Sequence, residues 1–302
     1  MSYRRANDYI LQTADYTQEV GVDFGKYNLE ELKELWRATM EKGMHGLCFS
    51  MYEDGQTPGD TISEKQVERR VKILKPYVSW IRSFSCIEGN EHIPVHAKKQ
   101  GIKTMVGAWL SDDKEDNERE ISGMIELGKK GMIDIAAVGN EVLYRDDLSL
   151  EELIGYIKRV KESLPGVTVG YVDAYYEFSV HPELVEISDV ILANCYPYWE
   201  GCHIDHSLNH MQQMYHQAKD AGRGKKVIIT ETGWPSEGGS LNGAESSEIN
   251  AMKYFINAQK WCDASNIEMF YFSSFDESWK TGDEGDVGAY WGLWDKHERL
   301  KF

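Results

Sequence analysis

The sequence predicts an α/β fold, a single (β/α)8 barrel of the TIM-barrel architecture, from three observations. Eight short apolar segments of strand type recur along the 302 residues, segments with helical periodicity lie between them, and no linker rich in Pro, Gly or Ser divides the chain. Most strand segments are apolar at consecutive positions, as expected when both faces of a parallel sheet are covered. Eight such units in a chain of this length are typical of the barrel. A doubly wound open sheet is the alternative, because large open sheets also occur.

The elements follow one another in a regular order. The segment 149–166 begins with Ser149 and has Glu152 three residues later, which is a capping box, and it ends at Pro165-Gly166. The segments 204–222 and 246–262 have similar helical signals, and the acidic run 112–122 is typical of a helix N-terminus. The predicted strands are 46–52, 78–86, 102–110, 133–141, 168–175, 190–198, 226–234 and 267–275.

Residues 1–43 are predicted to be an N-terminal extension, with the barrel at 44–302. The extension contains a predicted helix that begins at Asn28 and ends at Gly43. The segment after the eighth strand, 276–302, has no good helical pattern. We therefore expect the N-terminal helix to pack between strands eight and one, in place of the missing last helix; a position at the bottom of the barrel is the alternative. Its apolar stripe is Leu29, Leu32, Trp36 and Met40.

Composition excludes some classes of partner. The net charge of −17 argues against nucleic acid and against an anionic membrane surface, and it suits a neutral substrate. Residues 1–20 contain no long apolar stretch and no window is long enough to span a bilayer, so we expect a cytoplasmic protein, or a secreted or periplasmic one if a leader has been removed. The five cysteines do not form a disulfide framework. We expect a monomer.

Two glutamates lie at the ends of predicted strands. Glu141 ends the fourth strand and Glu231 ends the seventh, and in a barrel both reach the same rim from opposite sides. Either one alone would be an ordinary exposed residue. Together they predict a glycosidase, because retaining enzymes of this class hold two carboxyls about 5–5.5 Å apart. The aromatic and polar residues of the rim are the candidates for sugar binding: Tyr52, Arg82, Trp109, Asn140, Asp173, Tyr196, Tyr198, Trp234, Glu277 and Lys280.

Three short motifs carry a resemblance to a known family. The strings 138-VGNEV-142, 229-ITETGWPS-236 and 275-FDESWK-280, in this order and at these spacings, resemble glycoside hydrolase family 17. Enzymes of this family act on β-1,3-glucan as endo-glucanases or glucanosyltransferases. The resemblance covers about residues 44–302 and leaves residues 1–43 outside. Val142 is a departure, because many barrel glycosidases have proline after the Asn-Glu pair.

The resemblance implies a role for each matching residue. Glu141 would be the general acid/base and Glu231 the nucleophile. Asn140 would lie beside the sugar 2-hydroxyl, and Tyr196 would orient Glu231. Glu277 and Lys280 would support the site.

Several alternatives stay open at this point. The chain could act on another β-glycan such as a β-1,4-mannan, or be an inactive carbohydrate-binding barrel. Hydrolysis or glucanosyl transfer, and endo or exo action, are not decided. Cys202, His203 and His206 fit no standard zinc spacing, so we expect neither metal nor cofactor. His92 and His96 are predicted to be surface residues of a loop around Pro94.

Overall fold

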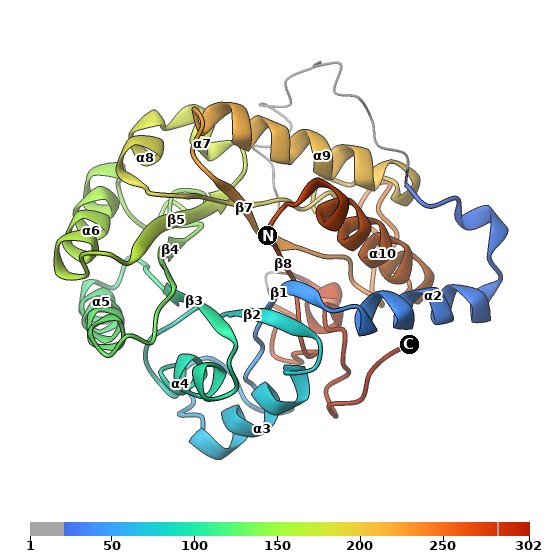
Figure 1. The fold of residues 1–302 in the computed structure, drawn as a ribbon, viewed down its shortest axis with the longest axis horizontal. Helices are drawn as coiled ribbons and strands as arrows, with labels where there is room; N and C mark the ends of the chain where they lie inside the picture. The colour runs from blue at the N-terminus through green and yellow to red at the C-terminus, as the bar shows by residue number, and fades with distance from the viewer. Residues whose placement is uncertain (1–20, 283) are drawn as a thin grey trace.

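The protein is a closed barrel of eight parallel strands, seen in a computed structural model that describes residues 21–282 and 284–302 (Figure 1). The strands follow one another around the barrel in chain order, and the last pairs with the first through Gly46–Phe270 and Leu47–Tyr271. This closure confirms the barrel and excludes the open sheet. The strands are β1 (Met44–Cys48), β2 (Val78–Arg82), β3 (Lys103–Ala108), β4 (Ile135–Asn140), β5 (Thr168–Ala174), β6 (Ile191–Asn194), β7 (Val227–Thr232) and β8 (Met269–Tyr271).

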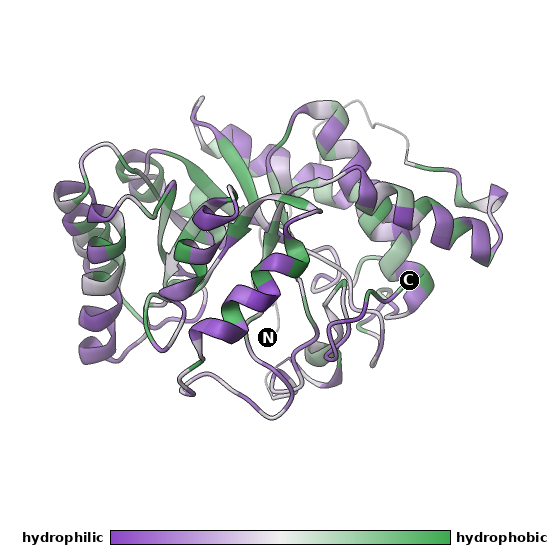
Figure 2. Cartoon of the chain, turned by 60° about the horizontal axis from the view of Figure 1, so that its bottom comes forward, coloured by the Kyte–Doolittle hydropathy of each residue, from purple (hydrophilic) through white to green (hydrophobic). Residues whose placement is uncertain are grey.

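The strands are buried on both faces, which explains their consecutive apolar residues. Every residue of β4, β6, β7 and β8 is buried. Figure 2 shows hydrophobic residues concentrated in the central strands, while hydrophilic residues dominate the outer surfaces of the helices. Close packing needs a glycine at one position: a Cβ on Gly46 would lie 2.5 Å from the ring of Phe270. Helices outside and side chains inside therefore cover both faces of the sheet.

Helices alternate with the strands, and most begin at a local capping residue. Ser149 and Glu152 form the predicted capping box of α6, and Asp113 caps α5 at the start of the acidic run. The helices are α2 (Leu29–Glu41), α3 (Glu64–Leu74), α4 (His92–Lys99), α5 (Lys114–Lys129), α6 (Leu150–Ser163), α7 (Glu177–Val180), α8 (Pro182–Ile187), α9 (Ile204–Ala221) and α10 (Glu248–Ser265), with 3-10 turns η1 (Phe24–Lys26) and η2 (Asp286–Tyr290). No helix of the described residues is long and apolar enough to cross a membrane.

The predicted loop around Pro94 is wrong, because these residues form helix α4. Pro94 lies in the first turn of the helix, where a missing backbone N–H costs nothing. His96 is 3% exposed, and its Nε2 lies 2.9 Å from a carboxylate oxygen of Glu64 on α3. His96 is therefore a partnered residue between two helices and not a surface residue.

Helix α2 packs beside α10, as Figure 1 shows. Trp36 is fully buried, with its ring 5.6 Å from that of Phe255 on α10 and 5.2 Å from that of Phe302. Phe255 in turn lies 5.0 Å from Tyr271 on β8. One residue of the predicted stripe is wrong: Leu29, the first residue of the helix, is 46% exposed.

Part of the predicted extension lies outside the described residues, namely 1–20. Asn28 and Glu31 form a capping box at the start of α2, and Gly43 follows its end with a φ of 88°. The division of the chain into an extension (1–43) and a barrel (44–302) stays a prediction.

The chain after β8 closes back onto the rim. Among its described residues the only helical turn is η2. Near the C-terminus, Lys301 donates to Asp276 at 2.7 Å and to Ser236 at 2.8 Å. This buried ion pair ties the last residues of the chain to the loops that follow β7 and β8.

Candidate active site

The turn after β4 presents Glu141 in an unusual backbone conformation. Gly139 has a φ of 84° and Glu141 a φ of 52°, and the pairing of β4 with β5 shifts register between Ala137 and Asn140. An irregularity of this kind at a barrel rim re-aims the side chains that follow it. Asn140 and Glu141 are consequently brought into the barrel mouth, where they are 8% and 5% exposed.

Glu231 lies at the end of β7 and is surrounded by donors. Arg82 donates to its Oε1 at 2.6 Å and Asn194 donates to the same oxygen at 3.2 Å. Tyr196 donates to its Oε2 at 2.8 Å, which fits the orienting role implied for this tyrosine. The guanidinium and the two further donors fix the position of this carboxylate. This environment suits a nucleophile.

Asn194, at the end of β6, connects the two glutamates. Its Nδ2 donates at 2.9 Å to Oε1 of Glu141 as well as to Glu231, and its Oδ1 accepts from the hydroxyl of Thr230 at 2.8 Å. The hydroxyl of Thr230 fixes the orientation of the amide. These two bonds laid end to end limit the distance between the two glutamate oxygens to about 6 Å.

Arg82, at the end of β2, joins the nucleophile to Asn140. Its Nη2 donates to Oδ1 of Asn140 at 2.7 Å while Nη1 holds Glu231. The carbonyl of the Asn140 amide thus faces Arg82. The guanidinium lies 4.2 Å from the ring centre of Phe84, and Cys48 lies close beneath it at 3.7 Å. Burial raises the pKa of the Cys48 thiol to about 12, so this cysteine stays neutral.

Glu277 and Lys280, in the loop after β8, form an ion pair at 3.0 Å. The ammonium lies 4.2 Å from the ring centre of Phe272, and this ring lies 6.1 Å from that of Tyr196. Burial alone would lower the pKa of Lys280, but surrounding carboxylates, Glu277 first and Glu231 among them, raise it. Lys280 therefore contributes a positive charge near Glu231, which its partner Glu277 partly offsets.

Two aromatic side chains of the predicted set are accessible at the rim. Trp109 is 37% exposed and its ring lies 4.5 Å from the guanidinium of Arg145. Tyr52 is half-buried and makes an edge contact of 5.7 Å with Trp279, which is 36% exposed. These rings offer apolar faces of the kind that stack on sugars.

Three residues of the predicted sugar-binding set are not brought to the open rim. Asp173 is completely buried and contacts the hydroxyl of Tyr171. Tyr198 and Trp234 are each 1% exposed and lie 5.2 Å apart, with their polar atoms bonded to backbone carbonyls. The structure covers all three side chains with neighbouring elements, so it does not support direct contact with a substrate.

Asn194 is the central residue that sequence reasoning left out of the predicted site. It ends an apolar run, as Glu141 and Glu231 do, and this position was the available signal. Phe272 was missed for a different reason. Its contact with Tyr196 depends on how the ends of β6 and β8 are placed in the barrel, and no local pattern shows that placement.

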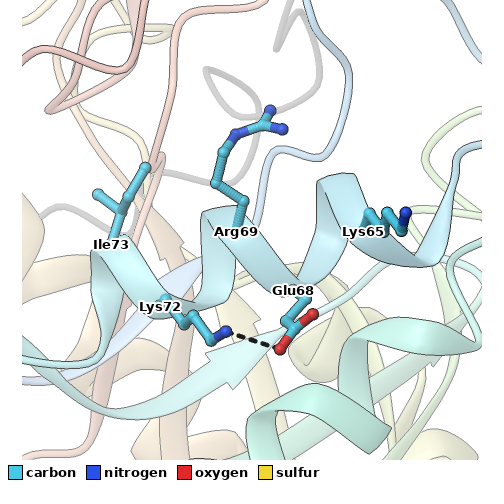
Figure 3. Close-up of a pocket in the computed structure, with 5 residues that line it drawn as sticks. All are labelled: Lys65, Glu68, Arg69, Lys72 and Ile73. Atoms are coloured by element: carbon cyan, nitrogen blue, oxygen red, sulfur yellow. Dashed lines mark ion pairs between the residues drawn. The ribbon is translucent and has the colours of Figure 1, made fainter.

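No three His, Cys, Asp or Glu side chains of the described residues gather in a way that could hold a metal ion. His210, four residues after His206 on α9, contacts the buried carboxylate of Glu200. A shallow hollow lies on the outer surface of α3, lined by Lys65, Glu68, Arg69, Lys72 and Ile73 (Figure 3). It offers one ion pair, between Lys72 and Glu68 at 2.7 Å, and contains none of the residues of the barrel mouth.

A (β/α)8 barrel with two glutamates facing each other across its mouth, one of them held by a guanidinium and a tyrosine, defines the class of the glycoside hydrolases. The model of the BtgE/BtgC glycoside hydrolase domain matches residues 46–292, and the chain belongs to this family.

Relatives and solved structures agree with this assignment. The chain is 27% identical to a glucan 1,3-beta-glucosidase of Arthroderma benhamiae over 270 residues, which cover 82% of this chain and 86% of that protein. It is 26% identical to a glucan 1,3-beta-glucosidase of Saccharomyces cerevisiae, over 81% of this chain and 86% of that protein. A glycoside hydrolase family 17 beta-1,3-glucanosyltransferase from Rhizomucor miehei superposes with a TM-score of 0.77 at 29% identity, over 86% of this chain and 96% of that one. An active-site mutant of that enzyme has been solved with laminaritriose. The resemblance to family 17 is confirmed.

Proposed function

We propose that this protein is a retaining glycosidase that cleaves β-1,3-glucan of the laminarin type through a covalent glycosyl-enzyme intermediate. The observation that carries the proposal is the bridge of Asn194, which brings Glu141 and Glu231 within reach of one glycosidic bond. The named relatives support β-1,3-glucan as the substrate, and the laminaritriose complex of the Rhizomucor miehei enzyme supports the same choice.

In the first step the two glutamates act on opposite ends of the scissile bond. Glu231 attacks the anomeric carbon while Glu141 gives its proton to the departing oxygen. The three donors around Glu231 hold the attacking carboxylate in place. Asn140 then presents its amide to the 2-hydroxyl of the sugar, because Arg82 occupies its oxygen.

In the second step an acceptor hydroxyl releases the sugar from Glu231. Glu141, now ionised, removes a proton from water, and the oxygen attacks the anomeric carbon on the face that the leaving group vacated. Two inversions leave the β configuration unchanged. Arg82 and Tyr196 stabilise the carboxylate that Glu231 regains.

Variants of the two glutamates test this proposal. Glu231→Ala should abolish turnover while oligosaccharide binding is largely kept. Glu141→Ala should slow substrates with poor leaving groups far more than aryl glycosides with good ones, and added azide should restore rate and give a β-glycosyl azide. Near-normal activity of Glu141→Ala on laminarin, or an α-anomer as the first product in NMR, would contradict the mechanism.

A panel of polysaccharides tests the substrate. Laminarin should be degraded, whereas β-1,4-mannan and β-1,4-glucan should not. A protein that binds laminari-oligosaccharides without cleaving them or any aryl glycoside would be a binding barrel instead.

Glucanosyl transfer is the second candidate, because the Rhizomucor miehei neighbour at 29% identity is named as a glucanosyltransferase. Transfer uses the same intermediate, with a sugar hydroxyl in place of water. Mass spectrometry of the products of a single laminari-oligosaccharide separates the two reactions. Products longer than the starting sugar show transfer.

The cytoplasmic location and the monomeric state remain predictions from the sequence. Cell fractionation tests the first, and light scattering coupled to size-exclusion chromatography tests the second.

A further inference from the structure

The acid/base Glu141 lies in a backbone turn that needs outside support. Its φ of 52° is in the left-handed region, which costs a residue other than glycine on the order of 1–2 kcal/mol. Such a conformation persists only when the surroundings hold it. Within the turn, Arg145 N–H donates to Glu141 O at 2.9 Å and Asp147 N–H donates to Val142 O at 3.0 Å. On the β5 side, Glu141 N–H donates to Val172 O at 2.8 Å, and Leu143 N–H donates to a side chain.

That side chain is Tyr171 on β5. Its hydroxyl accepts from Leu143 N–H at 3.0 Å, two residues beyond Glu141. The ring of Tyr171 is fully buried and packs beneath the turn, where a Cβ on Gly139 would lie 3.3 Å from its Cε2. The tyrosine therefore supports the turn both with its ring and with its hydroxyl.

Asp173, two residues along the same strand, completes the chain of hydrogen bonds. Its Oδ2 contacts the Tyr171 hydroxyl and its Oδ1 accepts from Ala174 N–H at 2.7 Å. A tyrosine oxygen has one hydrogen and two lone pairs, so a lone pair remains for Leu143 N–H whichever of Tyr171 and Asp173 supplies the hydrogen between them. Burial, with Glu141 and Glu177 nearby, raises the pKa of Asp173 well above its usual range.

We propose that Tyr171 and Asp173 form a positioning pair for catalysis, which holds the Glu141 turn so that the acid/base reaches the glycosidic oxygen. This proposal depends on the proposed function. It gives the completely buried Asp173 a role near the site that needs no contact with a sugar. Neither residue is a catalytic residue, because both act through the backbone of the turn.

The substrate's leaving group distinguishes positioning from simple stabilisation. Misplacing the acid by about 1 Å can cost about 100-fold in rate, but only where protonation of the leaving group is needed. A 2,4-dinitrophenyl β-laminaribioside has a leaving group that departs without a proton. A laminari-oligosaccharide does not.

The experiment measures kcat/KM of the full chain on both substrates for Tyr171→Phe, with Glu141→Gln as the reference for complete loss of the acid. Tyr171→Phe should lose about 10- to 100-fold on the oligosaccharide and less than about threefold on the dinitrophenyl substrate. Thr104→Val is the matched control. It removes a buried hydroxyl near the start of β3, away from the rim, where the hydroxyl donates to Met132 O at 2.8 Å. The control should leave kcat/KM unchanged on both substrates.

Asp173→Asn is the second variant, used in case Tyr171→Phe does not fold. It keeps the Tyr171 hydroxyl. It should show the same selectivity with a smaller loss, about fivefold on the oligosaccharide. Equal losses on both substrates, or no loss on either, would overturn the positioning role. If the unmodified protein cleaves neither substrate, the proposed function fails instead, so the two failures are distinguishable.

Discussion

Asn194 offers the sharpest test of the site, because a single amide donates to both glutamates. A hydrogen bond to a charged group contributes about 1.5–3 kcal/mol. Replacing Asn194 with alanine removes one such bond, to the Glu231 carboxylate, and a second bond to Glu141, while Arg82 and Tyr196 still hold Glu231. Only the share of this hydrogen-bond energy that is gained in the transition state affects the rate. We therefore expect about a 100-fold loss in kcat/KM, which corresponds to about 2.7 kcal/mol.

Asn194→Asp refines the same prediction through the dependence of kcat/KM on pH. A third carboxylate between Glu141 and Glu231 disfavours ionisation of its neighbours. Because Glu231 must be ionised to attack, the acidic limb of the profile should move to higher pH. The amide is completely buried, so solvent screens this repulsion little.

The assay is hydrolysis of a laminari-oligosaccharide across a pH series, with unfolding by urea as the measure of stability. Asn250→Ala is the matched control, since its buried amide donates to Glu245 O at 3.0 Å at the start of α10. It should lose stability without a shift in the pH profile. Two results would refute the bridging role: kcat/KM of Asn194→Ala within about threefold of the unmodified protein, or a loss of kcat/KM in Asn250→Ala as large as that in Asn194→Ala.

Three buried groups give further predictions. Trp36→Ala should lower the free energy of unfolding in urea by about 3–5 kcal/mol. Trp36→Phe should lower it much less, because the indole N–H has no hydrogen-bond partner among the described residues. Deleting residues 1–43 should lower the Tm sharply or make the protein insoluble, and an unchanged Tm would show the extension to be dispensable. Burial raises the pKa of Glu120 to about 7 from its usual 4.5, so its proton is held more tightly in the folded state and stability should fall by about 3 kcal/mol as pH rises between these values. Glu120→Gln should flatten that part of the curve of unfolding free energy against pH, and an unchanged slope would contradict the assignment. Lys301→Met removes the partner of Asp276, and burial raises the pKa of this aspartate to about 6. The free energy of unfolding should fall by about 3–5 kcal/mol at pH 8 and by less at pH 5, where Asp276 takes up a proton. Equal losses at both pH values would argue against the ion pair.

The sequence by itself determined the elements whose signals are local. The strands were predictable because helices and barrel interior bury both of their faces, which leaves consecutive apolar residues. The caps of α2 and α6 were predictable because a side chain and the backbone it caps lie within three residues. Glu141 and Glu231 were found because strand ends share one rim in this fold. Helix α4 was missed because Pro94 is a poor helix signal away from the first turn, and the sequence did not show where that turn begins.

Only the tertiary structure decided which side chains meet and which are covered. Asn194 contacts Glu141 across 53 residues of sequence and Arg82 contacts Glu231 across 149, and both contacts depend on barrel closure and on shifts of strand register at the rim. Asp173, Tyr198 and Trp234 are polar or aromatic residues near strand ends, as the accessible rim residues are, but neighbouring elements bury them. A residue type limits the bonds that a side chain can make. Which of those bonds form depends on the groups that the folded chain places within about 3 Å of it, and in this barrel those groups come from distant strands.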